Sequence, residues 1–177
     1  MRERIIIIGA GGHGKVVCDA ILASNKYEIM GFVDSTLPVG TSVIESYKVL
    51  FCQDDLEKNS DGADCFIVAI GNNTIREKVF DEASKLFKPA IVIHPLAYIG
   101  IDVEIGDGSV ILAGSVISTS CIVEKNAIIN SGVVIDHDCY VGACVHLSVG
   151  TNVGSNSKVN SFITTDIGEN IQPFSIR

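Results

Sequence analysis

A six-residue repeat fills the second half of the chain and limits its possible folds more than any other feature. From Ile93 to Val159 every sixth residue is aliphatic, and the residue four places after each is small or β-branched. The aliphatic positions are Ile93, Ile99, Ile105, Ile111, Ile117, Val123, Ile129, Ile135, Val141, Leu147, Val153 and Val159. A helix repeats its apolar face about every 3.6 residues and a strand about every two, so neither explains this period. The pattern predicts a parallel β-helix, in which three hexapeptides make a coil and stacked coils share one core.

The repeat frame changes near the end of the sequence. Thr165 occupies the next aliphatic position, and residues 167–171 predict one more hexapeptide that is displaced by two residues. We therefore expect the β-helix to cover residues 93–177 and to be shortened at its C-terminal end.

The first half of the chain begins with a strand, a glycine-rich loop and a helix. Residues 5–8 form an apolar, β-branched run, residues 9–15 read GAGGHGK, and residues 16–23 have helical content. A second strand over residues 28–33 ends at Asp34. This order of elements typically holds a phosphate at the N-terminus of the helix.

The same loop also matches the dinucleotide fingerprint. Gly9, Gly11 and Gly14 spell GxGxxG, and Asp34 follows about twenty residues later. However, a domain over residues 1–92 is too short for the two mononucleotide-binding halves of an NAD fold. We therefore expect a Rossmann-like half domain that binds one nucleotide, with a nicotinamide oxidoreductase as the competing hypothesis.

The rest of this domain predicts a second strand–helix unit. Residues 36–62 are polar and read as irregular, and residues 65–70 as a buried strand. We expect Thr74 to cap a helix over residues 75–86, with Glu77 completing a capping box. A last strand over residues 90–93 then leads into the β-helix.

Charge and cysteine content restrict the possible partners. The net charge of −8 argues against a nucleic acid or an anionic membrane, although backbone N–H groups could still bind a phosphorylated small molecule. The six cysteines contain no CxxC pair, and the apolar run within residues 1–8 is too short for a signal peptide or a membrane span, so we expect neither. We expect a soluble cytoplasmic protein with reduced thiols.

The clearest candidate for chemistry is Asp136-His137-Asp138. His137 is the third residue of its repeat, a position that tends to lie outside. Flanking carboxylates stabilise an imidazolium and make the histidine more basic, which suits a general base. The alternative is a surface histidine in a polar turn.

His146 is the second histidine of the β-helix. It follows His137 by nine residues, or half a coil, so we expect the two on different faces and out of reach within one chain. They could converge where subunits of a three-fold oligomer meet. A zinc site at such an interface would need a third ligand that is not evident, so we expect no metal.

Three motifs together resemble those of bacterial sugar acyltransferases of the NeuD/PglD type. They are GAGGHGK at residues 9–15, AIGNN at residues 69–73 followed by Ile75-Arg76, and DHDC at residues 136–139. The resemblance covers nearly the whole chain. It implies a left-handed β-helix and a homotrimer with active sites between subunits. It also implies acetyl-CoA as co-substrate and a UDP-linked amino sugar or a sialic acid as acceptor, in surface-glycan biosynthesis.

The resemblance also assigns roles to residues of the N-terminal domain. The residues expected to bind the substrate are Gly11, Gly12, His13, Asp34, Ser35, Gly71 and Asn72. The first three would contact it through the glycine loop, and Asp34 and Ser35 would contact the uridine. For His13, the residues alone leave a ligand contact and a packing role equally open.

The catalytic roles fall on the β-helix. His137 would take a proton from the sugar amine or hydroxyl, Asp138 would raise its basicity, and His146 would lie in the acetyl-CoA groove and help to stabilise the oxyanion. Family members usually continue into further coils and a glycine-rich tail, so we expect a shorter coenzyme groove here. A sugar-nucleotide-binding trimer without catalysis is the alternative.

Overall fold

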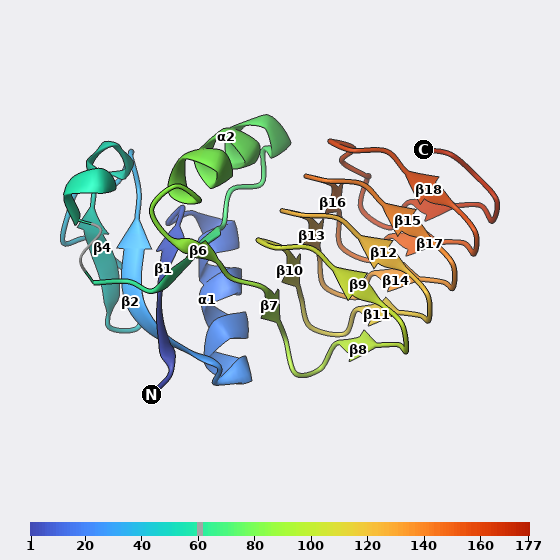
Figure 1. Cartoon of the computed structure of the whole chain (residues 1–177), viewed down its shortest axis with the longest axis horizontal. Helices are drawn as coiled ribbons and strands as arrows, with labels where there is room; N and C mark the ends of the chain where they lie inside the picture. The colour runs from blue at the N-terminus through green and yellow to red at the C-terminus, as the bar shows by residue number, and fades with distance from the viewer. Residues whose placement is uncertain (60–61) are drawn as a thin grey trace.

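The structure is a computed structural model that describes residues 1–59 and 62–177. It consists of an α/β domain and a parallel β-helix that lie side by side (Figure 1). The N-terminus lies in the first and the C-terminus at the far end of the second. This architecture confirms the predicted fold class. Neither helix in the described ranges has both the length and the apolar character needed to cross a bilayer.

The α/β domain is built on a six-stranded sheet with the order β3-β4-β2-β1-β5-β6. Its strands are β1 (Glu3–Ile8), β2 (Tyr27–Val33), β3 (Ser42–Ile44), β4 (Tyr47–Phe51), β5 (Cys65–Val68) and β6 (Lys88–Pro89). All neighbours pair in parallel except β3 and β4. The central strands β1 and β5 are apolar runs because both of their faces are covered.

Two helices cover the two faces of this sheet. Helix α1 (Gly12–Ser24) packs with Ile5 and Ile7 in a core that also includes Val92 and Val110 of the β-helix. Helix α2 (Asn73–Ala83) packs with Ile6 and Ile8 on the opposite face. Helix α1 therefore lies between the sheet and the β-helix, as Figure 1 shows.

The β-helix consists of two-residue strands arranged in three sheets. They are β7 (Val92–Ile93), β8 (Tyr98–Ile99), β9 (Glu104–Ile105), β10 (Val110–Ile111), β11 (Val116–Ile117), β12 (Ile122–Val123), β13 (Ile128–Ile129), β14 (Val134–Ile135), β15 (Tyr140–Val141), β16 (His146–Leu147), β17 (Asn152–Val153), β18 (Lys158–Val159) and β19 (Asn170–Ile171). The sheet orders are β16-β13-β10-β7, β19-β17-β14-β11-β8 and β18-β15-β12-β9. Each strand pairs with the strand one coil away, and the predicted aliphatic positions form the shared core.

The interior also contains columns of small polar residues that tie one coil to the next. Cys121 donates from Sγ to the Asp136 carbonyl at 3.0 Å, and Cys139 does the same to Gly154 at 3.2 Å. The Ser115 hydroxyl makes the equivalent bond to the Asn130 carbonyl at 2.9 Å. These bonds satisfy turn carbonyls inside the core, which explains why small residues with a donor recur at this position.

The predicted break in the repeat is wrong. Thr165 stays in the frame and is buried, because its Oγ1 accepts the Ser148 N–H at 2.8 Å and lies 2.8 Å from Thr151 Oγ1. Ile171 pairs in register beside Val153, so the last hexapeptide is not displaced. A satisfied hydroxyl can replace an aliphatic side chain in such a column.

Three local predictions for the α/β domain are also corrected. Helix α2 is capped by Asn72, whose Oδ1 accepts the Ile75 N–H at 3.0 Å, and not by Thr74. Helix α1 begins at Gly12, inside the glycine loop. The stretch predicted as irregular contains β3, β4 and the 3-10 helices Gln53–Asp55 and Glu57–Asn59. Residues 60–61 of that stretch lie outside the described residues.

Candidate active site

The glycine loop leaves backbone groups open at the N-terminus of α1. Gly11 is the N-cap and makes no side-chain capping bond, and Gly11 and Gly12 are exposed with open space where a Cβ would stand. Gly14 is different, because a Cβ there would lie 2.1 Å from the Gly9 carbonyl oxygen. The loop can therefore close tightly while its first helical N–H groups stay free for an anion.

Asp34 holds this loop in place. Its Oδ2 accepts the Ala10 N–H at 2.8 Å, and its Oδ1 accepts the N–H groups of Thr36 and Leu37 at 2.8 and 2.9 Å and the Thr36 hydroxyl at 2.6 Å. Burial raises the pKa of this carboxyl, but these donors together outweigh it and hold the pKa below its ordinary value. The carboxylate thus organises the loop, and the neighbouring Ser35 is exposed, as are residues 36–40 after it.

The loop after β5 brings Gly71 toward the β-helix. Gly71 is exposed, and a Cβ on it would lie 4.0 Å from His146 Cε1. The adjacent Asn72 uses its side-chain oxygen to cap α2. Gly71 and Asn72, two of the residues predicted to bind the substrate, therefore lie where the two domains meet.

His13 and His146 face each other at this junction. Their ring centroids are 6.2 Å apart, and His146 Nε2 lies 3.3 Å from Asn130 Nδ2. His13 Nε2 is buried without a hydrogen-bond partner among the described residues. Burial, the neighbouring His146 and Arg76 lower the pKa of His13 to about 4, and burial and Arg76 also lower the pKa of His146. Both rings are therefore neutral near pH 7.

His137 is exposed on the turn between β14 and β15. Its Nδ1 lies 2.7 Å from Asp138 Oδ2, and its backbone N–H donates to Asp136 Oδ1 at 2.8 Å. The hydrogen bond with Asp138 raises the pKa of the imidazole, and the charge of Asp136 adds to this. With Nδ1 held by a carboxylate, Nε2 is the nitrogen available for proton transfer.

The structure brings some of the predicted residues together and separates others. Gly11 to His13, Gly71 and His146 meet at the domain junction, because β16 belongs to the sheet whose first strand, β7, packs against α1. His146 faces the α/β domain, and its place in the coenzyme groove stays a prediction. His137 lies at the corner between the two other β-helix sheets, so within one chain it is on a different face from His146.

Two residues at the junction were missed as site residues. Asn130 contacts His146, and Arg76 is buried between Gly71 and the β-helix. Arg76 had a readable signal, since it shares the apolar face of α2 with Val79, Phe80 and Ala83. A cation on an apolar helix face needs buried hydrogen-bond partners, but the sequence does not say which they are.

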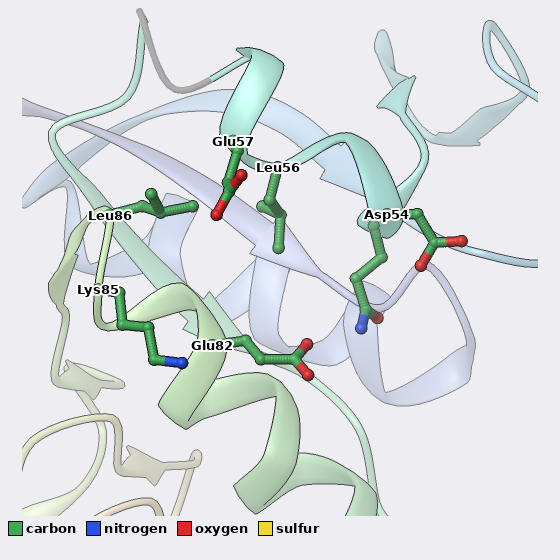
Figure 2. Close-up of a pocket in the computed structure, with 7 residues that line it drawn as sticks. Asp54, Leu56, Glu57, Glu82, Lys85 and Leu86 are labelled. Atoms are coloured by element: carbon green, nitrogen blue, oxygen red, sulfur yellow. The ribbon is translucent and has the colours of Figure 1, made fainter.

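A separate hollow of about 300 Å³ opens on the α/β domain, between the 3-10 helices and α2 (Figure 2). Its lining residues are Gln53, Asp54, Leu56, Glu57, Glu82, Lys85 and Leu86. Three carboxylates and one ammonium make it unsuited to a phosphate, and it lies beside the C-terminal half of α2, away from Gly71. Within residues 1–59 and 62–177, no group of three or more His, Cys, Asp and Glu side chains has the arrangement of a metal site.

Comparisons with known proteins agree with this fold. A family model described as the PglD N-terminal domain matches residues 4–83. The acetyltransferase domain of PglB from Neisseria gonorrhoeae FA1090 is 30% identical, with a TM-score of 0.75 over 99% of this chain and 88% of that chain. Its complex with acetyl coenzyme A gives the same identity and TM-score over 99% and 96%. PerB from Caulobacter crescentus, in complex with CoA and GDP-perosamine, is 29% identical with a TM-score of 0.72 over 97% and 84%.

Proposed function

The chain belongs to the PglD/NeuD-type sugar acetyltransferases, and on this basis we propose that it transfers an acetyl group from acetyl-CoA to the amino group of a nucleoside-diphosphate-linked sugar. The observation that carries the proposal is the exposed His137–Asp138 pair, with 2.7 Å between Nδ1 and Oδ2, on a β-helix joined to a glycine-loop domain. A relative solved with acetyl coenzyme A and another solved with CoA and GDP-perosamine support the two substrate classes.

The acceptor binds at the domain junction. The free N–H groups at the start of α1 bind the diphosphate, because a helix N-terminus attracts negative charge even in an acidic protein. Ser35 lies at the nucleoside edge, and Asp34 supports it by holding the glycine loop. Gly71, Asn72 and His13 surround the sugar. UDP was the nucleotide expected from the family resemblance, and GDP is the one in the PerB complex, so both belong in a substrate test.

The chemistry is base-assisted attack on a thioester. His137 Nε2 takes a proton from the amine as its nitrogen forms a bond to the acetyl carbonyl carbon. Asp138 stabilises the imidazolium that results. The carbon–sulfur bond then breaks, the coenzyme sulfur takes up the proton, and the products are the amide and CoA thiol. His146 contributes from the junction, where its ring meets the acetyl end of the coenzyme.

The complete site is formed by more than one subunit. His137 and the acceptor loops lie on different faces of one chain, so catalysis requires a neighbouring copy to bring them together. The two β-helix sheets not covered by the α/β domain expose Tyr98, Ile122 and Val134, at 61%, 39% and 38%, which suits subunit contacts. A homotrimer, operating in the cytoplasm where its six thiols stay reduced, satisfies these requirements.

Acetyl transfer separates this proposal from the binding-only alternative. Purified protein is mixed with acetyl-CoA and a panel of UDP- and GDP-linked amino sugars, and CoA thiol release and acetylated product are measured together. Transfer to one of these sugars that stops in His137→Ala supports the proposal. Saturable binding of both ligands without thiol release would leave a sugar-nucleotide-binding protein instead.

A further inference from the structure

Arg76 is a buried cation whose partners are all backbone carbonyls. It is 1% exposed, and no carboxylate in the described part of the chain forms an ion pair with it. Its Nε donates to Asn126 O at 3.1 Å, Nη1 to Ile70 O and Gly71 O at 3.0 and 3.2 Å, and Nη2 to Cys144 O and Val145 O at 2.9 and 3.3 Å. A guanidinium has five N–H donors, so each one has an acceptor here.

These acceptors belong to two regions that must be held in register. Two of the carbonyls come from the loop after β5, which presents Gly71. Two others, of Cys144 and Val145, come from the β-helix turn just before His146, and the Asn126 carbonyl comes from the equivalent turn one coil earlier. One side chain therefore ties the Gly71 loop to two successive coils. This connection lies beside the place where Gly71 and His146 are close neighbours, since a Cβ on Gly71 would lie 4.0 Å from His146 Cε1.

The rest of α2 follows the same stack of coils. Gly108, Asn126, Cys144 and Phe162 are one coil apart, and all have positive φ angles of 76°, 57°, 58° and 65°. Phe80 packs on Gly108, where a Cβ would lie 2.3 Å from its ring, and Asn73 donates to Phe162 O at 2.8 Å. A helical turn rises about 5.4 Å and strands are spaced by about 4.8 Å, so successive turns of α2 meet successive coils.

Packing alone does not explain an arginine at this position. Burying a charge without a counter-ion is costly, whereas an apolar side chain of similar volume would fill the space but leave these five carbonyls without their donor. Only a planar group with several fixed donors can bind both sets of carbonyls at once. The choice of arginine therefore points to a geometric requirement at the junction.

We propose that Arg76 is a positioning residue of the acceptor site, which sets the Gly71 loop at its working distance from the His146 face. The inference rests on the proposed function. In this proposal Arg76 makes no contact with the substrate. It affects the acceptor site at the domain junction and not the turn that contains His137. His146 is also held in the β-helix by its own N–H, which donates to the Ile163 carbonyl at 2.8 Å. Loss of the arginine should therefore displace mainly the Gly71 loop and weaken the use of the nucleotide sugar far more than the use of acetyl-CoA.

Kinetic constants of Arg76→Ala and Arg76→Lys test this separation. We expect both variants to raise KM for the nucleotide sugar about tenfold or more, with KM for acetyl-CoA within about twofold, because misplacing one binding loop removes well-oriented contacts. Lysine keeps the charge but has three donors, so it should not restore the wild-type value.

Methylguanidine added to Arg76→Ala should lower KM again, whereas methylammonium should not. Phe80→Leu, which changes a different contact between α2 and the β-helix, at Gly108, without touching the Gly71 loop, is the control and should leave both KM values unchanged.

An activity-independent measurement keeps this inference distinct from the proposed function. Hydrogen exchange at residues 70–73 should become faster in Arg76→Ala than in Phe80→Leu at equal distance from their unfolding temperatures. This holds even if the protein acetylates none of the sugars tested. Unchanged exchange there, or a lysine variant with wild-type KM for the nucleotide sugar, would overturn the positioning role.

Discussion

At the scale of single residues, the proposed chemistry depends on one histidine and the carboxylate beside it. His137 is exposed, and its Nδ1 lies 2.7 Å from Asp138 Oδ2. With Nδ1 held in this way, Nε2 is the ring nitrogen that remains accessible. An exposed imidazole would otherwise rotate freely and populate both tautomers. The Asp138 carboxylate selects the His137 tautomer in which Nε2 is the basic nitrogen. The same carboxylate therefore sets both the orientation of the ring and its basicity.

Asp138→Asn should alter the pH dependence of the reaction as well as its rate. The Asp138 carboxylate raises the pKa of His137, so wild-type His137 stays protonated, and inactive as a base, up to a higher pH than an ordinary histidine. Removing the charge lowers that pKa, and the acid limb of the kcat/KM profile should move to lower pH while the plateau falls. The profile is measured with saturating acetyl-CoA. A limb that stays in place would mean that another group controls the titration.

At the scale of elements, the glycine loop and the β-helix coils hold the site through backbone geometry. Gly14 lies against the Gly9 carbonyl, whereas Gly12 faces open space at the N-terminus of α1. The two glycines are neighbours on one loop but have different roles. Gly14 permits the loop to close, and Gly12 leaves room for a ligand.

Alanine substitutions at Gly14 and Gly12 should have different effects, the first on the stability of the fold and the second on ligand binding. Gly14→Ala places a methyl group 2.1 Å from a backbone oxygen, and we expect a loss of about 1–3 kcal/mol of stability. Gly12→Ala meets no atom and should be neutral or slightly stabilising, since alanine favours the helix by about 1 kcal/mol. Its methyl group would instead obstruct the anion and raise KM for the nucleotide sugar. Thermal unfolding and initial rates distinguish the two effects, and equal losses of stability would contradict this division.

The sequence predicted the elements whose pattern is local and missed those set by tertiary contacts. The six-residue period was visible because each inward position sees the same environment in every coil, and it identified the coil-forming residues. Thr165 was misread as a break because its hydrogen bonds to Ser148 and Thr151 come from a coil earlier in the chain. The junction between His146, Asn130 and Arg76 could not be predicted, since it depends on how α2 lies along the coils.

At the scale of the whole molecule, the two domains share a buried junction that contains three basic side chains. His13, His146 and Arg76 are neighbours there, and burial lowers the pKa of each. At neutral pH the two imidazoles are uncharged, so they can lie beside the permanently charged Arg76 guanidinium without repulsion. This arrangement makes the association of the domains sensitive to acid.

Stability should fall as the pH drops below 6.5, and His13 should account for much of the loss. Its folded pKa is about 4, so between pH 6.5 and 4 the unfolded chain takes up a proton that the folded chain does not. Stability from this group is complete above pH 6.5 and is lost as the pH falls, by roughly 3 kcal/mol at pH 4. Denaturant titrations of wild type and His13→Gln over this range measure the difference. Parallel pH dependences of the two proteins would show that His13 does not contribute.

Mixed oligomers should show whether the site is shared between subunits. His137→Ala lacks the base, and Arg76→Ala has a misplaced acceptor loop, so each variant alone should be impaired. Exchange of subunits between them should recover activity at sites that combine a normal loop from one chain with a normal His137 from another. Activity is measured before and after mixing, with the mass in solution recorded to establish three chains per particle. No recovery in a verified mixed trimer would place both halves of the site within one chain.

The most direct test of the central claim is acetyl transfer by the wild-type protein and by His137→Asn, measured on the same nucleotide-linked amino sugar. We expect product that carries one added acetyl group, equal amounts of free CoA thiol, and a decrease in kcat of about 10²- to 10⁴-fold in the variant with little change in either KM. Undiminished transfer by His137→Asn would contradict the assignment of the base. Absence of transfer by the wild type to every UDP- and GDP-linked amino sugar, despite saturable binding of acetyl-CoA, would contradict the proposed reaction itself.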